Sequence, residues 1–251
     1  MVPVYEGMAK IYDTLMQDVN YDHWVDYIEE ILSKFDTSPK TVVDLACGTG
    51  NTTFPFAARG YQVTGVDLSD SMLERARVKA AKQGYSDIQF LQQDMRELNL
   101  PTAVDLVTCL YDSINYLPST AALAQTARQV FSALTPGGLF IFDANSAYKL
   151  SSIPDTTAFF EHEDMCLVWE NRYDAETRVW EARFTGFLQQ DDGLWERFKE
   201  VHRETAFTSE EYSDSLTKAG FEILAEYTAF SFSPPATDTS RIYYVARRPI
   251  P

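Results

Sequence analysis

The chain has 251 residues, of which 45% are hydrophobic and 23% charged, a composition typical of a globular protein with its own core. Its net charge of −16 argues against a nucleic-acid partner and against binding to an anionic membrane surface. Three widely spaced cysteines, Cys47, Cys109 and Cys166, argue against a disulfide framework or a zinc site, so we expect no bound metal. With neither a signal segment nor an apolar run of roughly 18 residues, we expect a cytoplasmic protein.

The chain begins with a region that we expect to form a helical cap, residues 1–38. Apolar residues recur at helical spacing over 5–16 and 21–35. From residue 39 onward, short apolar runs alternate with helical patterns. The expected strands are 41–46, 61–66, 88–92, 104–110 and 139–144, and the helices between them are 51–58, 70–82 and 120–134. This alternation predicts a parallel sheet covered by helices on both faces.

The rhythm changes after residue 147. Residues 148–207 contain three stretches rich in aromatic and β-branched residues, 165–173, 178–189 and 194–206, which predict an inserted antiparallel β meander. Thr208 and Glu211 form a capping-box pattern that begins a helix ending near Ala219. Two last strands, 221–230 and 242–246, complete a core that we assign to 39–147 and 208–251.

The strongest local pattern is the run from Asp44 to Asn51, Asp-Leu-Ala-Cys-Gly-Thr-Gly-Asn, at the end of the first expected strand. Gly48 and Gly50 allow a sharp turn and a close approach of backbone to ligand. Dinucleotide-binding enzymes also use such loops, but their third glycine is replaced here by Thr53. Two further carboxylates, Asp67 and Asp94, end the second and third strands, where they can accept hydrogen bonds from ribose hydroxyls and from an adenine amino group.

Over roughly residues 40–145, the chain resembles the class I S-adenosylmethionine-dependent methyltransferases. The order and spacing of three motifs match: the glycine loop, Gly-Val-Asp-Leu-Ser and Gln-Asp-Met. The resemblance implies an α/β, Rossmann-like, doubly wound sheet of seven strands with the last strand antiparallel. It also implies S-adenosyl-L-methionine as the cofactor. The N-terminal region, residues 1–38, is called the leader below. With Tyr12-Asp13 and Trp24, it is similar to the leader of the small-molecule N-methyltransferases of this family.

The resemblance also implies roles for individual positions. The methionine part of the cofactor would lie against Asp44, Ala46, Gly48 and Gly50 and against the backbone of Cys109 and Leu110. The ribose would bind Asp67, and the adenine would lie near Leu68, Met72, Asp94 and Met95. Tyr12 and Trp24 would close over the cofactor, since an aromatic face attracts a sulfonium cation; the alternative is that both rings belong to the core.

Methyl transfer is an in-line displacement in which positioning and water exclusion do much of the work. A general base is needed only when the acceptor must lose a proton, so the catalytic residue stays unknown at this level. The candidates are Tyr111, Asn115, Tyr116 and His162, with Asp112 beside them. His202 and His23 are interpreted as structural or surface residues.

The insertion is expected to form a lid on the acceptor side, with Trp169, Trp180 and Trp195 in it. These aromatic residues could instead pack the meander onto the core or form a dimer interface, which leaves monomer and homodimer open. We expect a small-molecule methyl acceptor. The alternatives are a methyltransferase acting on RNA or protein, a non-catalytic cofactor-binding module and a nicotinamide-dependent oxidoreductase.

Overall fold

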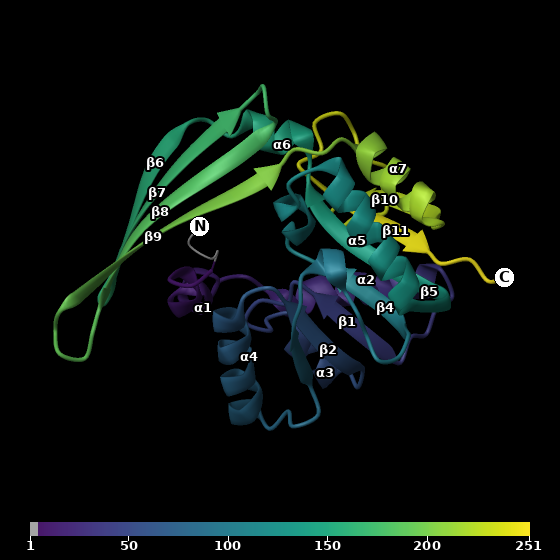
Figure 1. Cartoon of the computed structure of the whole chain (residues 1–251), viewed down its shortest axis with the longest axis horizontal. Helices are drawn as coiled ribbons and strands as arrows, with labels where there is room; N and C mark the ends of the chain where they lie inside the picture. The colour runs from purple at the N-terminus through teal and green to yellow at the C-terminus, as the bar shows by residue number, and fades with distance from the viewer. Residues whose placement is uncertain (1–4) are drawn as a thin grey trace.

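The computed structural model describes residues 5–251, which form two separate β-sheets (Figure 1). The larger sheet has seven strands in the order β10-β11-β5-β4-β1-β2-β3. Its strands are β1 (Thr41–Leu45), β2 (Gln62–Asp67), β3 (Gln89–Gln92), β4 (Val104–Cys109), β5 (Leu134–Asn145), β10 (Glu222–Thr228) and β11 (Arg241–Arg247). The last strand, β11, is antiparallel to both of its neighbours, whereas β1 to β5 pair in parallel. The predicted Rossmann-like sheet is therefore confirmed.

Helices cover both faces of this sheet. One face packs against α2 (Tyr21–Lys34) and α3 (Thr53–Ala58), and the other packs against α5 (Thr120–Ala133) and α7 (Ser209–Ala219). Successive strand residues point to opposite faces, so Val42 and Val43 lie in different hydrophobic clusters. The helix α4 (Asp70–Gln83) packs beside β2 and β3. Two buried faces explain why these strands read as nearly continuous apolar runs.

The N-terminal segment departs from the single helix predicted over residues 5–16. It forms two short turns, η1 (Met8–Lys10) and α1 (Tyr12–Leu15), interrupted at Ile11, whose φ is −119°. The carboxylate of Glu200, far along the chain, accepts hydrogen bonds from the backbone N–H groups of Tyr5, Gly7 and Met8. This contact pulls the segment onto a distant strand, which helical periodicity could not reveal.

The boundary between α5 and β5 also differs from the expectation. The helix ends at Ala133 and the strand begins at Leu134, five residues before the predicted start at residue 139. The N–H of Gly137 donates to the carbonyl of Arg248 at 2.8 Å, and the N–H of Arg248 donates to Gly138. Pairing with the C-terminal segment therefore extends the strand through a Pro-Gly-Gly sequence that reads locally as a turn.

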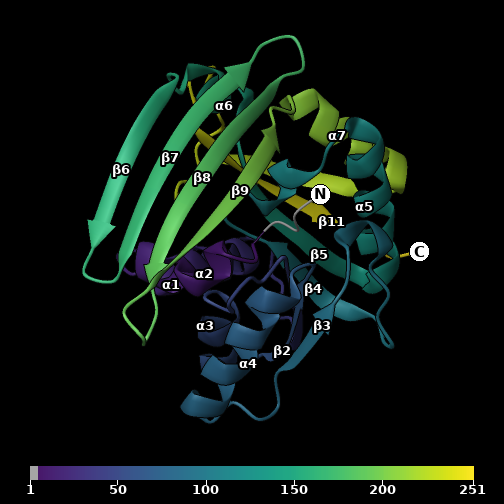
Figure 2. The same ribbon diagram turned by 60° about the vertical axis from the view of Figure 1, so that its left-hand side comes forward.

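The insertion forms the second sheet, four antiparallel strands in the order β6-β7-β8-β9, preceded by α6 (Ala147–Ser152). These strands are β6 (Thr156–His162), β7 (Met165–Asp174), β8 (Val179–Gln189) and β9 (Trp195–Thr205). Figure 2 shows β9 nearest the core and β6 on the far edge. The three predicted strands are confirmed, whereas β6 was missed because nearly all of its side chains are exposed and show no alternation.

The capping box of α7 provides a test of how local sequence stabilises this fold. The Thr208 hydroxyl accepts from the N–H of Glu211, and the Glu211 carboxylate accepts from the N–H of Thr208. Thr208→Ala should lower the free energy of unfolding by about 1 kcal/mol, measured by urea denaturation. Thr217→Ala, on the exposed face of the same helix, is the control and should not destabilise the protein.

Candidate functional site

The loop after β1 is held in an unusual backbone conformation. Ala46, Gly48 and Gly50 all have positive φ angles, of 61°, 55° and 85°. Behind the loop, Asp44 is buried and accepts hydrogen bonds from the hydroxyls of Thr52 and Thr53 at 2.8 and 2.6 Å. Burial raises the pKa of Asp44 to about 6. Asp44 therefore ties the loop to the start of α3.

Asp67, at the end of β2, points at the same loop. Its Oδ2 accepts from the N–H of Gly48 at 2.7 Å, and its Oδ1 accepts from the N–H of Ser69 at 2.8 Å. Each carboxylate oxygen keeps a further lone pair that can accept a ligand hydroxyl. Beside it, Leu68 is 64% exposed, whereas Met72 is buried with its Cε 3.9 Å from where a Cβ on Gly48 would lie.

Asp94 follows β3 and begins the short helix η2 (Met95–Glu97). Its carboxylate accepts two hydrogen bonds from Nε of Arg96, at 2.9 and 3.0 Å, and another from the Arg96 backbone. The hydrogen bonds from Arg96 lower the pKa of Asp94. A ligand amino group at Asp94 would therefore share the carboxylate with Arg96, a partner that the sequence analysis missed.

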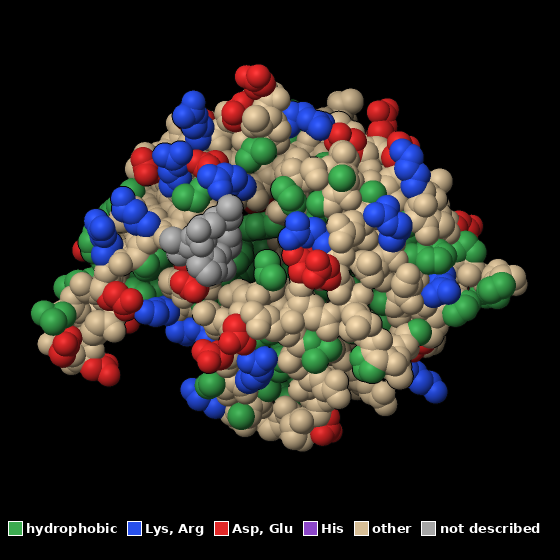
Figure 3. All heavy atoms as spheres, in the orientation of Figure 1, with side chains coloured by type: hydrophobic (Ala, Val, Ile, Leu, Met, Phe, Trp, Pro, Cys, Tyr) green, Lys and Arg blue, Asp and Glu red, His purple; other side chains and the backbone are tan. Residues whose placement is uncertain are grey.

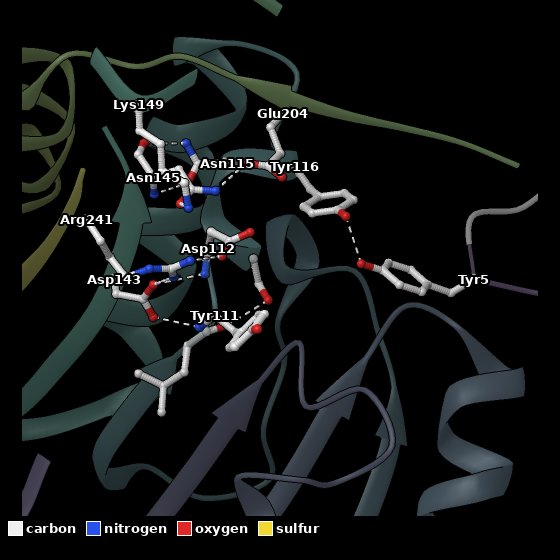
Figure 4. Close-up of polar contacts among 12 residues, drawn as sticks. Tyr5, Tyr111, Asp112, Asn115, Tyr116, Asp143, Asn145, Lys149, Glu204 and Arg241 are labelled. Carbon is white, nitrogen blue, oxygen red and sulfur yellow. Dashed lines mark hydrogen bonds and ion pairs between the residues drawn. The ribbon is translucent and has the colours of Figure 1, made fainter. Parts of the chain in front are cut away.

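The residues after β4 form a strained turn at the carboxyl end of the sheet. Tyr111 and Asp112 both adopt positive φ, 60° and 54°, which is costly for residues with a Cβ. The carboxylate of Asp143 on β5 accepts from the N–H groups of both residues, at 2.6 and 3.0 Å. Arg241 on β11 forms ion pairs with Asp143 and Asp112 (Figure 4). In the sequence, the one signal of this arrangement is Asp143, a charged residue inside the apolar run of β5.

The two cysteines near the site are both buried. Cys47 lies in the glycine loop, and Cys109 ends β4, followed by buried Leu110. Burial raises the pKa of both thiols well above the usual value. Neither cysteine is therefore suited to act as a nucleophile, in keeping with the interpretation of Cys47 as a loop residue.

The aromatic residues of the leader lie close to this turn. Tyr12 packs edge-on against Tyr5, with ring centroids 6.0 Å apart. Trp24, on α2, is buried against Tyr111 with ring centroids 5.0 Å apart, and the Arg241 guanidinium lies 5.3 Å from its ring. Trp24 thus belongs to the hydrophobic cluster under Tyr111, as the core interpretation allowed.

The candidate catalytic residues separate into three environments. Asn115 is fully buried, and its amide bonds to backbone groups of Asn145 and Thr205, which indicates a structural role. His162 is exposed and pairs with Asp164 at the turn between β6 and β7. Tyr116, in the short helix η3 (Ser113–Tyr116), instead lies among buried polar groups facing β9.

Tyr116 belongs to a chain of hydrogen bonds. Its hydroxyl lies 2.8 Å from the hydroxyl of Tyr5 and 3.0 Å from Nδ1 of His202. Nε2 of His202 lies 3.0 Å from Glu200, the carboxylate that also binds the leader. His202 is therefore buried and connected to Tyr116, a link that only the pairing of distant segments could create.

The surface between the two sheets is hollowed. Figure 3 shows a hollow floored by hydrophobic side chains, with acidic and basic groups at its edge. Within residues 5–251, no cluster of three His, Cys, Asp or Glu side chains is arranged to hold a metal ion. In the same part of the chain, no helix has the length and apolar character needed to cross a membrane.

Comparison with known proteins identifies the family. Residues 42–138 match the model of a methyltransferase domain. A protein of Geobacillus sp. (strain WCH70), named as a methyltransferase, is 34% identical over 97% of this chain and 99% of its own length. The crystal structure of an S-adenosylmethionine-dependent methyltransferase from Clostridium acetobutylicum ATCC 824 is 32% identical, with a TM-score of 0.85 over 98% of this chain and 99% of that one. The chain belongs to the S-adenosylmethionine-dependent methyltransferases.

A more distant relative of this methyltransferase acts on a small molecule. It is the dTDP-3-amino-3,4,6-trideoxy-α-D-glucopyranose N,N-dimethyltransferase of Streptomyces venezuelae, 24% identical over 86% of this chain and 90% of its own length. The glycine loop fits the family's cofactor, since a Cβ on Gly48 would approach only Met72, which leaves space for a ligand. Asp67 lies beside that space with lone pairs to offer.

Asp67→Ala should weaken binding of S-adenosylhomocysteine. The change removes the expected ribose acceptor and also the carboxylate that holds Gly48, so we expect a loss of at least about tenfold in affinity. Calorimetric titration of the folded variant measures it. Asp70→Ala, an exposed change at the start of α4, is the control, and an unaltered affinity in Asp67→Ala would remove Asp67 from the site.

Glu204, in β9, should make stability depend on pH. Burial, followed by the charge of Asp112, raises its pKa to about 8 in the folded protein. A raised folded pKa stabilises the protein below the unfolded pKa, and this contribution is lost as the pH rises through the folded value. Between about pH 5 and pH 8, the wild type should lose roughly 1–4 kcal/mol relative to Glu204→Gln in denaturant titrations. Parallel curves for the two proteins would contradict this assignment, and exposed Glu176→Gln is the control.

Proposed function

We propose that this methyltransferase transfers the methyl group of S-adenosylmethionine to a small-molecule acceptor. The observation that carries the proposal is the open space at the glycine loop, where a Cβ on Gly48 would approach only Met72 and where the Asp67 carboxylate bonds to the same loop. The strained turn at Tyr111 and Asp112 lies at the carboxyl end of the same sheet, where ligands bind in open α/β folds. The four-stranded sheet beside this end of the core leaves a hollow in the surface, which suits a small acceptor.

We infer that the cofactor lies across the carboxyl ends of β1, β2 and β3. In this arrangement the methionine part contacts the loop and the backbone after β4, the ribose binds Asp67, and the adenine lies near the ends of β2 and β3. The residues assigned are Asp44, Ala46, Gly48, Gly50, Asp67, Leu68, Met72, Asp94, Met95, Cys109 and Leu110. Exposure of Leu68 supports an adenine contact, and the burial of Asp44 supports a role in shaping the loop.

The leader completes the cofactor side in this proposal. Tyr12 covers the cofactor, while Trp24 acts through Tyr111, because its ring packs against Tyr111. The Ser69 hydroxyl donates to the carbonyl of Tyr5 at 3.2 Å, which joins the leader to the loop after Asp67. These contacts would keep water away from the reacting atoms.

The chemistry requires little beyond orientation. When bound, S-adenosylmethionine supplies a methyl group already activated by its sulfonium. The chain's own residues would align the acceptor in line with that group and exclude water. We assign the acceptor side to residues 148–207, whose four-stranded sheet would act as a lid, because β9 contacts η3 directly.

The main alternative is a methyltransferase acting on RNA or protein. The net charge of −16 disfavours RNA, since a polyanion would be repelled. The small-molecule substrate named for the Streptomyces venezuelae relative, which is 24% identical to this chain, supports our choice. A non-catalytic cofactor-binding module is the second alternative.

The test uses S-adenosylmethionine labelled in its methyl group. The purified protein is incubated with small-metabolite, RNA and protein fractions of a cell extract, and the label in each is counted. We expect label only in the metabolite fraction, and much less of it with Asp67→Ala when the cofactor is below saturation. Label in RNA or protein would overturn the small-molecule assignment. Binding of S-adenosylhomocysteine without label in any fraction would favour the non-catalytic module.

A further inference from the structure

Glu204 is a buried carboxyl group of which only one oxygen forms a hydrogen bond within residues 5–251. It lies on β9 and is only 5% exposed. Its Oε2 accepts from Nδ2 of Asn145 at 2.7 Å, whereas Oε1 makes no hydrogen bond within residues 5–251. A buried carboxyl group that is held in place through one oxygen is suited to binding a ligand through the other.

A second carboxylate faces the same space. Oδ1 of Asp112 pairs with Arg241, and Oδ2 has no hydrogen-bond partner among the described residues. Figure 4 shows the carboxyl groups of Glu204 and Asp112 on the same side of Arg241, with Tyr116 and Tyr5 beside the space between them. The charge of Asp112 contributes to raising the pKa of Glu204, which indicates that the two groups are close enough to interact.

Nearby cations do not neutralise both carboxyl groups. Arg241 is shared between Asp112 and Asp143. The ammonium of Lys149 bonds to Oδ1 of Asn145 at 2.7 Å rather than to Glu204, and burial lowers its pKa. Three carboxyl groups thus share two cations here. Burial and the charge of Asp112 raise the pKa of Glu204 and favour its neutral acid, and a bound ammonium would favour its carboxylate instead.

The hydrogen-bond chain adds an acceptor beside this space. An ionised Glu200 can only accept, so Nε2–H of His202 donates to it, and in the neutral imidazole Nδ1 then accepts from the Tyr116 hydroxyl. Tyr116 must then accept from Tyr5, which leaves the lone pairs of the Tyr5 oxygen for another donor. The faces of Tyr5 and Tyr116 also favour a cation.

We propose that Glu204 and Asp112 bind the protonated amino group of the methyl acceptor, so that this enzyme is an N-methyltransferase acting on a small amine. The inference rests on the proposed function, because it assumes a small acceptor in the hollow between the two sheets. Asp112 lies two residues after Leu110, next to the expected methionine part of the cofactor. A group held by Asp112 would therefore lie near the methyl group to be transferred.

Glu204 also accepts the proton that the amino group of the acceptor must lose. The acceptor binds as R–NH₃⁺ and gives one proton to the carboxylate of Glu204, which becomes the neutral acid. The freed nitrogen lone pair forms a bond to the methyl carbon while the carbon–sulfur bond breaks, its electron pair remaining on sulfur. The product is R–NH₂⁺–CH₃ with a neutral thioether, and Glu204 then releases its proton to solvent.

The test needs no knowledge of the acceptor. Sinefungin is a cofactor analogue that carries an amino group on carbon in place of the methyl sulfonium, so it places an ammonium at the transfer position. Wild-type protein should bind sinefungin at least about tenfold more tightly than S-adenosylhomocysteine. Glu204→Gln keeps the hydrogen bond to Asn145 but removes the charge, so it should abolish this preference while S-adenosylhomocysteine binds as before. Affinities are measured by calorimetry.

Glu196→Gln is the matched control, an exposed glutamate on the same strand that should retain the preference. The proposal is overturned if the wild type shows no preference for sinefungin, or if the preference survives in Glu204→Gln. An equal loss of S-adenosylmethionine affinity in that variant would also overturn it, because Glu204 would then serve the sulfonium of the donor. If the wild type itself does not bind S-adenosylhomocysteine, the result counts instead against the cofactor site and hence against the proposed function.

Discussion

The geometry of the site depends on one buried carboxylate, Asp143. It holds the N–H groups of Tyr111 and Asp112 in left-handed backbone conformations and shares Arg241 with Asp112. Two adjacent strained residues persist only where the surrounding structure compensates for their cost. Three strands meet here, since the turn follows β4, Asp143 lies on β5, and Arg241 begins β11. The antiparallel position of the last strand is therefore what brings the guanidinium to the end of the parallel strands.

A second carboxylate, Glu200, joins the N-terminal segment to strand β9 of the insertion. It binds the leader through three backbone N–H groups and orients His202, which in turn reaches Tyr116. The Phe198 ring reinforces the contact, because it occupies the places where a Cβ would lie on Gly7 and Gly186. The four-stranded sheet is thus fastened both to the leader and to η3. We expect acceptor access and leader position to be coupled, since the same strand carries both contacts.

The cofactor side and the acceptor side differ in how they are built. Gly48, Asp67 and Asp94 lie at or just after the ends of strands, within about fifty residues of one another in the chain, so spacing and residue type suffice to predict them. The proposed acceptor side combines Tyr5, Asp112 and Tyr116 with Glu204 from β9, and no local pattern relates these positions. The sequence prediction accordingly included Tyr116 as one candidate among several and placed His202 among the structural residues. It did not weigh Glu204 or Arg241.

The sequence by itself determined the fold class, the strand–helix alternation, the inserted meander and the family, because apolar periodicity and loop glycines are local consequences of chain geometry. The edge strand β6 has exposed side chains without alternation and forms by pairing with the adjacent β7. Tertiary structure alone decided the form of the leader and the early start of β5, where hydrogen bonds to distant segments outweigh local preference. It also decided which polar residues are buried together. The packing of distant segments decides that Asn115 is buried, that His162 is exposed and that Glu204 is bonded through only one oxygen within residues 5–251. Burial then fixes the charge and the chemistry of each group.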